Sequence, residues 1–126
     1  GVSPVFETPK PAPSAAYKQV RRNGVVQDAK DNWVQAWVEV DMFAATTDDD
    51  DVTTTKAKHE EAYQEKLDAA AAAVARETRN RLLAPTDFYA LSDVTMSDDM
   101  KTYRAALRAV PAQDGFPNTI TWPKAP

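Results

Sequence analysis

The stretch RNRLLAPTDFYALSDVTMSDDMKTYRAALRAVPAQDGFPNTITWPKAP, residues 79–126, decides how this chain folds. Two helical signals flank its turn-rich centre. The first ends at Pro85, because proline lacks the amide hydrogen that a helix interior needs. The second covers residues 98–110 and follows Ser97, whose hydroxyl is suited to cap a helix. Pro111 ends this helix, and the residues after it predict an extended Pro/Trp tail that folds back across the helix pair.

The second predicted helix carries a pair of arginines. Arg104 and Arg108 are four residues apart and therefore share a helix face. Such a pair is suited to clamp a carboxylate of a binding partner. The alternative is pairing within the fold, for which Asp87 and Asp93 are the nearest candidates. The sequence leaves both interpretations open.

Upstream, residues 53–84 predict one long helix, because neither Gly nor Pro occurs there. Its apolar seam is narrow and comprises Tyr63, Leu67, Ala70 and Val74. At about 1.5 Å per residue the helix would be roughly 40 Å or more in length. A small domain cannot bury both ends of such a rod. We therefore expect it to pack against a partner helix or to form a homo-oligomer as a coiled coil.

Residues 17–43 predict a small antiparallel sheet. Asn23-Gly24 is a strong hairpin signal, and residues 28–32 form a second polar turn. The clearest strand is residues 33–43, whose aliphatic face we expect to be the core. Its other face carries Trp33 and Trp37, which predict either a second packing surface or a patch that binds a saccharide or a fibre.

Two segments flank this small β-subdomain. Residues 1–16 contain four prolines, which favour extended backbone, and read as a linker or as an arm that lies on a partner. Residues 44–52 include four consecutive aspartates, Asp48 to Asp51. A calcium loop of the EF-hand type needs alternating ligands and a central Gly, which are absent, so we expect a solvated acidic linker.

Composition argues against several classes of function. A net charge of −4 argues against nucleic-acid binding, which needs a concentrated basic face. The chain has no Cys and a single His, His59, so thiolate and multi-His metal sites are excluded. No apolar run approaches the roughly 20 residues of a membrane span. Phosphate-loop and nucleophile motifs are also missing, and we therefore expect neither enzyme activity nor a cofactor.

The order of motifs in the last third resembles a known family. R-N-R-L-L-A-x-T-D begins at Arg79, Y-R-A-A-L-R begins at Tyr103, and G-F-P and W-P follow. Together with the strand and charged helix before them, these motifs resemble phage tail assembly chaperones and tail fibre assembly proteins over residues 17–126. One position departs from the family pattern, since Phe88 stands where the family usually has tryptophan.

The resemblance implies a bacteriophage protein that binds tail fibre or tail polypeptides and aids their assembly, in the virion tail or in the host bacterial cytoplasm. One alternative is a structural virion subunit or adaptor that joins fibre to tail, and a weaker one is a saccharide-binding module. The fold expected is α+β, in four segments: 1–16, 17–43, 44–52 and 53–126. The candidate partner-binding residues are aromatic anchors and cations: Trp33, Trp37, Arg104, Arg108, Phe116 and Trp122.

Overall fold

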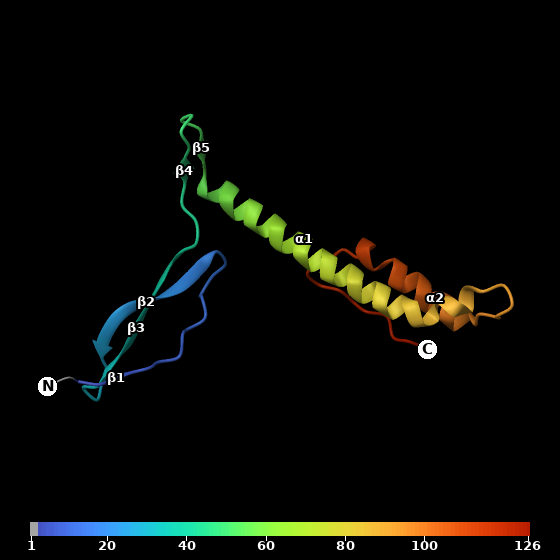
Figure 1. Ribbon diagram of the computed structural model, residues 1–126, viewed down its shortest axis with the longest axis horizontal. Coiled ribbons are helices and arrows are strands. Elements are labelled where there is room, and N and C mark those ends of the chain that lie inside the picture. Colours follow the sequence, from blue (N-terminus) through green and yellow to red (C-terminus); the bar gives the residue numbers. More distant parts are fainter. Residues whose placement is uncertain (1–2) are drawn as a thin grey trace. The chain divides into compact units, whose positions relative to one another are not determined.

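A computed structural model describes residues 3–126 and confirms an α+β fold. The chain forms two compact units, Gly1–Glu61 and Ala62–Pro126. Figure 1 labels the main elements. In chain order these are β1 (Val5–Phe6), β2 (Lys18–Gln27), β3 (Trp33–Asp41), β4 (Thr46–Thr47), β5 (Thr53–Thr54), α1 (Lys56–Leu83), the 3₁₀ helix η1 (Ala84–Ala90), α2 (Asp98–Arg108) and the 3₁₀ helix η2 (Val110–Ala112).

The first unit contains a three-stranded sheet in the order β1-β3-β2. Strands β2 and β3 are antiparallel, as expected, whereas β1 joins β3 in parallel. Strand β1 comes from the proline-rich arm. The arm therefore belongs to this sheet, and its Val5 and Phe6 pair with Trp33 and Val34 of β3.

The predicted hairpin at Asn23-Gly24 is wrong. Strand β2 continues through both residues, and the register shifts between Arg22 and Val25, which marks a β-bulge. Gly24 has a φ of 71°, so the glycine supplies the left-handed conformation of a bulge and not that of a turn. The chain reverses instead at the second predicted turn, residues 28–32.

The two faces of the sheet are covered differently. Direct pairing of Val20 with Glu39 puts Val20 on the face that carries Trp37. The arm lies against this face, since Ser14 donates hydrogen bonds to the Glu39 carboxylate at 2.7–2.9 Å. Val20 is consequently buried. The aliphatic face that we expected to be the core, which includes Val34, is only half-buried.

The acidic segment is the tip of a second, two-stranded sheet. Strands β4 and β5 pair Thr46 with Thr54 and Thr47 with Thr53. The Asp48 carboxylate accepts hydrogen bonds from the amides of residues 50 and 52, at 3.0 and 2.9 Å, and so closes the turn. His59 at the start of α1 lies 2.8 Å from the Thr46 hydroxyl. Residues 3–126 contain no group of three or more His, Cys, Asp or Glu that could hold a metal ion.

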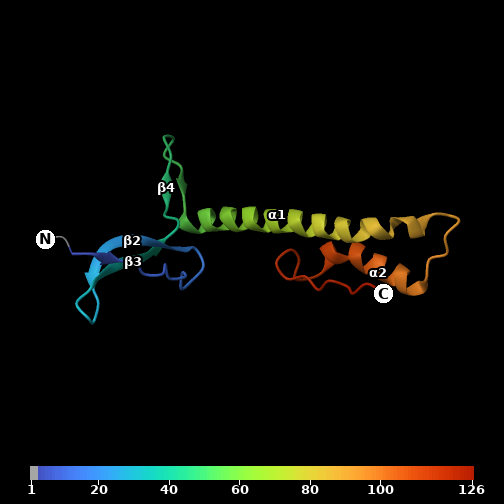
Figure 2. The same ribbon diagram turned by 60° about the horizontal axis from the view of Figure 1, so that its bottom comes forward.

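The second unit is built from helices. Figures 1 and 2 show α2 running alongside the carboxy-terminal half of α1. Ser97 caps α2 as predicted, because its side chain accepts a hydrogen bond from the Met100 amide. Leu107 and Val110 are fully buried. Helix α1 contributes only alanines to the buried set, Ala72 and Ala75, and these small side chains allow close packing.

The predicted apolar seam of α1 does not form the core of this unit. Leu67 is 44% exposed and Val74 is 63% exposed. The seam is therefore largely open to solvent, and its self-association remains a prediction. Nowhere in residues 3–126 is a helix both long and apolar enough to cross a membrane.

Candidate protein-binding groove

Arg104 is an internal residue of the second unit. Its guanidinium donates to the Thr86 hydroxyl at 2.6 Å and to the Asp87 carboxylate at 3.0 Å. Arg104 is 8% exposed, as is Thr86. Of the two interpretations that the sequence left open, the structure shows pairing within the fold, and we do not include Arg104 in the proposed binding site.

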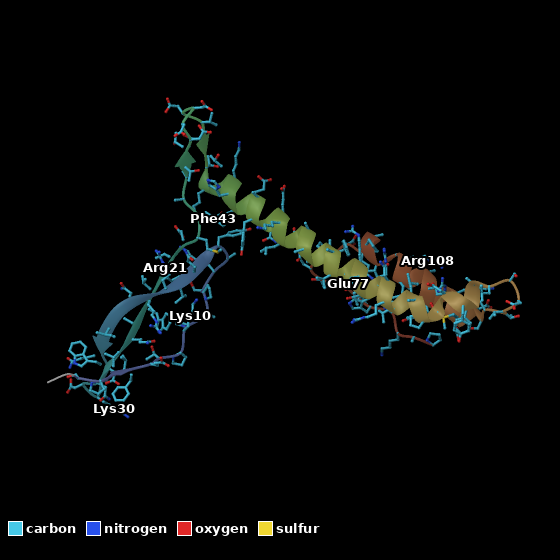
Figure 3. All side chains as sticks on the ribbon, viewed as in Figure 1. Lys10, Arg21, Lys30, Phe43, Glu77 and Arg108 are labelled. Atoms are coloured by element: carbon cyan, nitrogen blue, oxygen red, sulfur yellow. The ribbon has the colours of Figure 1, made fainter. Side chains whose placement is uncertain are left out.

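Arg108 differs from Arg104 although the two share a helix. It lies at the end of α2 (Figure 3), is exposed, and forms no ion pair within residues 3–126. It is therefore available to a partner. A partner-binding role for Arg108 stays a prediction.

The segment after η2 closes on itself before it crosses α1. The Gln113 side chain donates to the Thr121 carbonyl at 2.8 Å and accepts from the Thr121 amide at 2.9 Å. The Thr119 amide also donates to the Gly115 carbonyl at 2.7 Å. The Gln113 carboxamide thus bonds both backbone groups of Thr121, as a neighbouring strand would, and closes the loop of residues 114–120.

Two contacts hold this loop on α1. The Asn118 amide donates to the Asp68 carboxylate at 3.0 Å. The Arg76 guanidinium lies 5.4 Å from the centroid of the Phe116 ring, a cation–π distance. Hydrogen bonds from Asn118 and Gln64 lower the pKa of Asp68, so the carboxylate stays charged to a lower pH than an ordinary aspartate. Phe116, which the sequence suggested as a partner-binding residue, is here half-buried against the chain's own helix.

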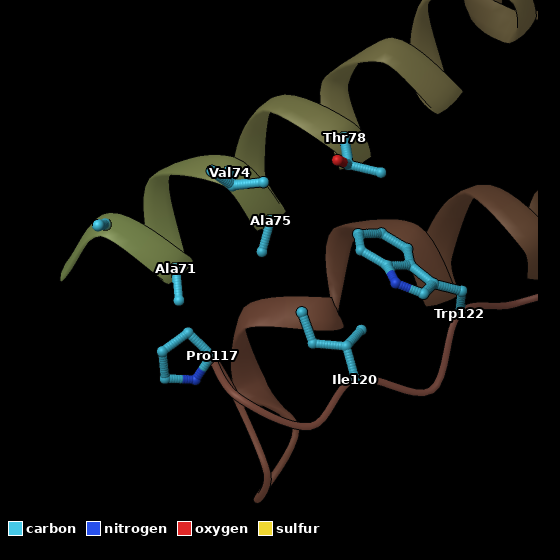
Figure 4. Close-up of a pocket in the computed structure, with 8 residues that line it drawn as sticks. Ala71, Val74, Ala75, Thr78, Pro117, Ile120 and Trp122 are labelled. Carbon is cyan, nitrogen blue, oxygen red and sulfur yellow. The ribbon is translucent and has the colours of Figure 1, made fainter. Parts of the chain in front are cut away.

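An apolar groove lies between α1 and the tail. Figure 4 shows Pro117, Ile120 and Trp122 facing residues of α1. The groove has a volume of about 480 Å³ and is lined by Ala70, Ala71, Val74, Ala75, Thr78, Pro117, Ile120 and Trp122. No lining residue carries a charge. The groove therefore fits apolar side chains, and the small alanines allow a ligand backbone to approach the helix closely.

A second hollow continues the groove along α1. It shares Val74 and Thr78 with the groove and adds Glu77, Asn80 and Arg81. The groove and the second hollow thus form one continuous surface. Its groove end is apolar, and its other end carries the negative charge of Glu77 and the positive charge of Arg81. A polypeptide segment with apolar side chains followed by polar ones would match this order.

The remaining candidate residues belong to the other unit. The Trp37 indole N–H donates to the Thr8 hydroxyl at 2.8 Å, and the side chain is half-buried. Trp33 is 39% exposed. Trp37 therefore contacts the chain's own proline-rich arm, whereas Trp33 remains accessible, and a partner-binding role for either tryptophan stays a prediction.

Sequence reasoning named Trp122, and it placed Ala70 and Val74 in the apolar seam of the long helix, but it did not predict that the tail and this helix form a groove. Ala70, Ala71, Ala75 and Thr78 carry no chemistry that a motif search would detect. The available signal was the alanine run in the middle of an otherwise charged helix, since small residues on a helix allow another segment to come close.

Comparison with known proteins gives one match. Residues 72–126 match the family described as phage tail assembly chaperone protein. No curated protein and no solved structure matches the chain. Every residue that lines the groove, except Ala70 and Ala71, falls within the matched segment. The resemblance predicted from the motif order is confirmed for residues 72–126, which are similar to the phage tail assembly chaperone family, and this match supports a role in phage tail assembly.

Proposed function

We propose that this protein binds an apolar segment of a phage tail or tail fibre polypeptide in the groove between α1 and the tail, and protects that segment until assembly. The observation that carries the proposal is an uncharged groove whose tail wall and most of whose helix wall lie in the segment that matches the chaperone family. A chaperone of this kind must cover apolar surface that a partner will later bury.

Val74 is the central contact of the proposed site. It lines both hollows and is 63% exposed, so a ligand can bury it. Full burial of a valine side chain contributes about 1.5 kcal/mol or more, and most of that remains available here. The rim residues Glu77 and Arg81 would set the direction of the bound segment, because charged groups at an edge contribute more to orientation than to affinity.

We place this activity in the host bacterial cytoplasm during assembly. The alternative is a virion subunit or adaptor, for which a proline-rich arm free to dock on a partner would be suited. In the structure the arm is occupied by its own sheet, through β1 and through the Ser14–Glu39 hydrogen bonds. Mass spectrometry of purified virions separates the two: a chaperone is absent or scarce, whereas a subunit is present in fixed stoichiometry.

A matched pair of substitutions tests the groove itself. Val74 and Val52 are similarly exposed, at 63% and 58%, but Val52 belongs to the first unit. We expect that the tail or tail fibre polypeptide that copurifies with the wild-type protein will not copurify with Val74→Asp. Binding would bury the new carboxylate in an uncharged groove. Val52→Asp should leave copurification intact. Equal retention of the partner by both variants would exclude the groove as the binding site.

A further inference from the structure

A second kind of hollow lies in the first unit, at the end of the sheet where β3 begins. It has a volume of about 290 Å³ and is lined by Ser3, Pro4, Phe6, Gln27, Asp31, Asn32 and Trp33. The hollow combines aromatic rings with two carboxamides and a carboxylate. This chemistry differs from that of the uncharged groove in the second unit.

The aromatic rings are accessible. Trp33 is 39% exposed and Phe6 is 51% exposed. In the sheet register Trp33 lies directly opposite Gln27, so the indole and the Gln27 amide are cross-strand neighbours on one face. An aromatic surface with a hydrogen-bonding amide beside it is therefore part of the strand pairing itself.

The polar wall is held in place before any ligand arrives. The Asp28 carboxylate accepts hydrogen bonds from the amides of Lys30 and Asn32, at 2.8 and 3.0 Å. These bonds lower the pKa of Asp28 and fix the loop that carries Asp31 and Asn32. Asp31 is exposed, and its carboxylate has no hydrogen bond or ion pair to any of residues 3–126. A preorganised loop lowers the ordering cost of binding.

This combination fits a sugar ring. A pyranose presents an apolar C–H face that packs on an aromatic ring, and neighbouring hydroxyls that donate to a carboxylate and exchange hydrogen bonds with amides. Of the described residues that line the hollow, only Asp31 is charged, and its negative charge disfavours anionic ligands. We propose that this hollow binds a neutral hexopyranose unit of a saccharide, with Trp33 as the stacking surface and Asp31 as the hydroxyl acceptor.

The site lies in a different unit from the groove, so either proposal can fail without the other. The test is an NMR titration of the full chain with methyl glycosides of glucose, galactose, mannose, rhamnose and N-acetylglucosamine. We expect at least one of them to shift the indole N–H signal of Trp33 saturably, while the signals of Trp37 and Trp122 stay fixed. No saturable shift with any glycoside overturns the proposal, and so does an equal response to glucuronate.

Two substitutions refine the test without touching the sheet core. Asp31→Ala should weaken glycoside binding about tenfold, because it removes a hydrogen bond to a charged acceptor. Asp51→Ala, in the exposed tip between β4 and β5, is the matched control, because Asp31 and Asp51 have nearly the same φ, 61° and 60°, and it should have no effect. Unchanged binding in Asp31→Ala, with a folded protein by circular dichroism, contradicts the assignment of the hydroxyl acceptor.

Discussion

Replacing Arg104 should destabilise the second unit, although the same substitution at Arg108 should not. The Arg104 guanidinium donates to Thr86, whose own hydroxyl donates to the Leu83 carbonyl at 2.7 Å. This chain of bonds joins α2 to the carbonyl end of α1. In Arg104→Ala the chain loses its charged donor, and the buried Thr86 oxygen loses a partner.

The magnitude follows from the burial of each contact. A hydrogen bond from a charged donor to the buried Thr86 hydroxyl contributes about 1.5–3 kcal/mol. The Asp87 side chain is 67% exposed, so its ion pair with Arg104 adds at most about 0.5 kcal/mol after solvent screening. We expect Arg104→Ala to lower the free energy of unfolding by about 2–3 kcal/mol. For the exposed Arg108→Ala the expected change is within about 0.5 kcal/mol.

Urea denaturation followed by far-ultraviolet circular dichroism measures this difference, because the helical signal comes mainly from α1 and α2. A loss of 2–3 kcal/mol corresponds to a midpoint shift of about 1 M urea or more. A double-mutant cycle with Thr86→Val should give a coupling energy, since the two residues share a hydrogen bond. Equal midpoints for the Arg104 and Arg108 variants, or strict additivity in the cycle, would refute the role we assign to Arg104.

Four further predictions concern other parts of the molecule. Gly115→Ala places a Cβ 2.6 Å from the Thr119 backbone oxygen and should destabilise the loop by about 1–3 kcal/mol in the same urea assay. Gly24→Ala meets no atom within 4 Å, so its expected cost is only about 1 kcal/mol, from a positive φ that alanine disfavours. Asp68→Ala should be less stable than wild type at neutral pH, because the charged carboxylate accepts hydrogen bonds from the side-chain amides of Gln64 and Asn118. This difference in stability should vanish as the pH falls through the lowered pKa of Asp68, where the carboxylate becomes protonated. If the seam of α1 pairs two copies, sedimentation should show a concentration-dependent mass that Leu67→Asp abolishes; a strict monomer at all concentrations excludes the coiled coil.

The helical part of the fold could be predicted well, because its signals are local. Ser97 caps α2 through its own side chain, and Pro85 is the second residue of the 3₁₀ helix η1, directly after the end of α1 at Leu83. The long helix was expected over residues 53–84 and occupies Lys56–Leu83. Short-range chemistry is enough to place boundaries of this kind.

The sheet could not be predicted to the same degree, because its pairing depends on distant residues. The dipeptide Asn23-Gly24 has the conformational freedom for a hairpin, but the same positive φ also suits a bulge. Because β2 pairs with β3 on both sides of Asn23-Gly24, these residues form a bulge and not a hairpin turn. The position of the proline-rich arm likewise follows from its bonds to Glu39 and Gln35, about 25 residues away.

The groove could not be predicted from the sequence either, because it also depends on contacts between residues far apart in the chain. Its tail wall is held by the hydrogen bond between Asn118 and Asp68, which are separated by 50 residues. Trp122 is predicted as an anchor because it is a large apolar side chain on the extended segment that folds back across the helix pair. Its partner surface, a run of alanines, has no signature except small size.

Site-specific photocrosslinking tests the central claim most directly. A benzophenone amino acid at Val74 samples the groove, and the same group at the comparably exposed Val52 is the control. Each variant is produced together with the phage's tail and tail fibre polypeptides, irradiated, and analysed by mass spectrometry. We predict a crosslink from position 74 to one tail or tail fibre polypeptide, with none from position 52. Crosslinks of equal yield at both positions, or none at position 74 while the complex still copurifies, would contradict the assignment of the groove.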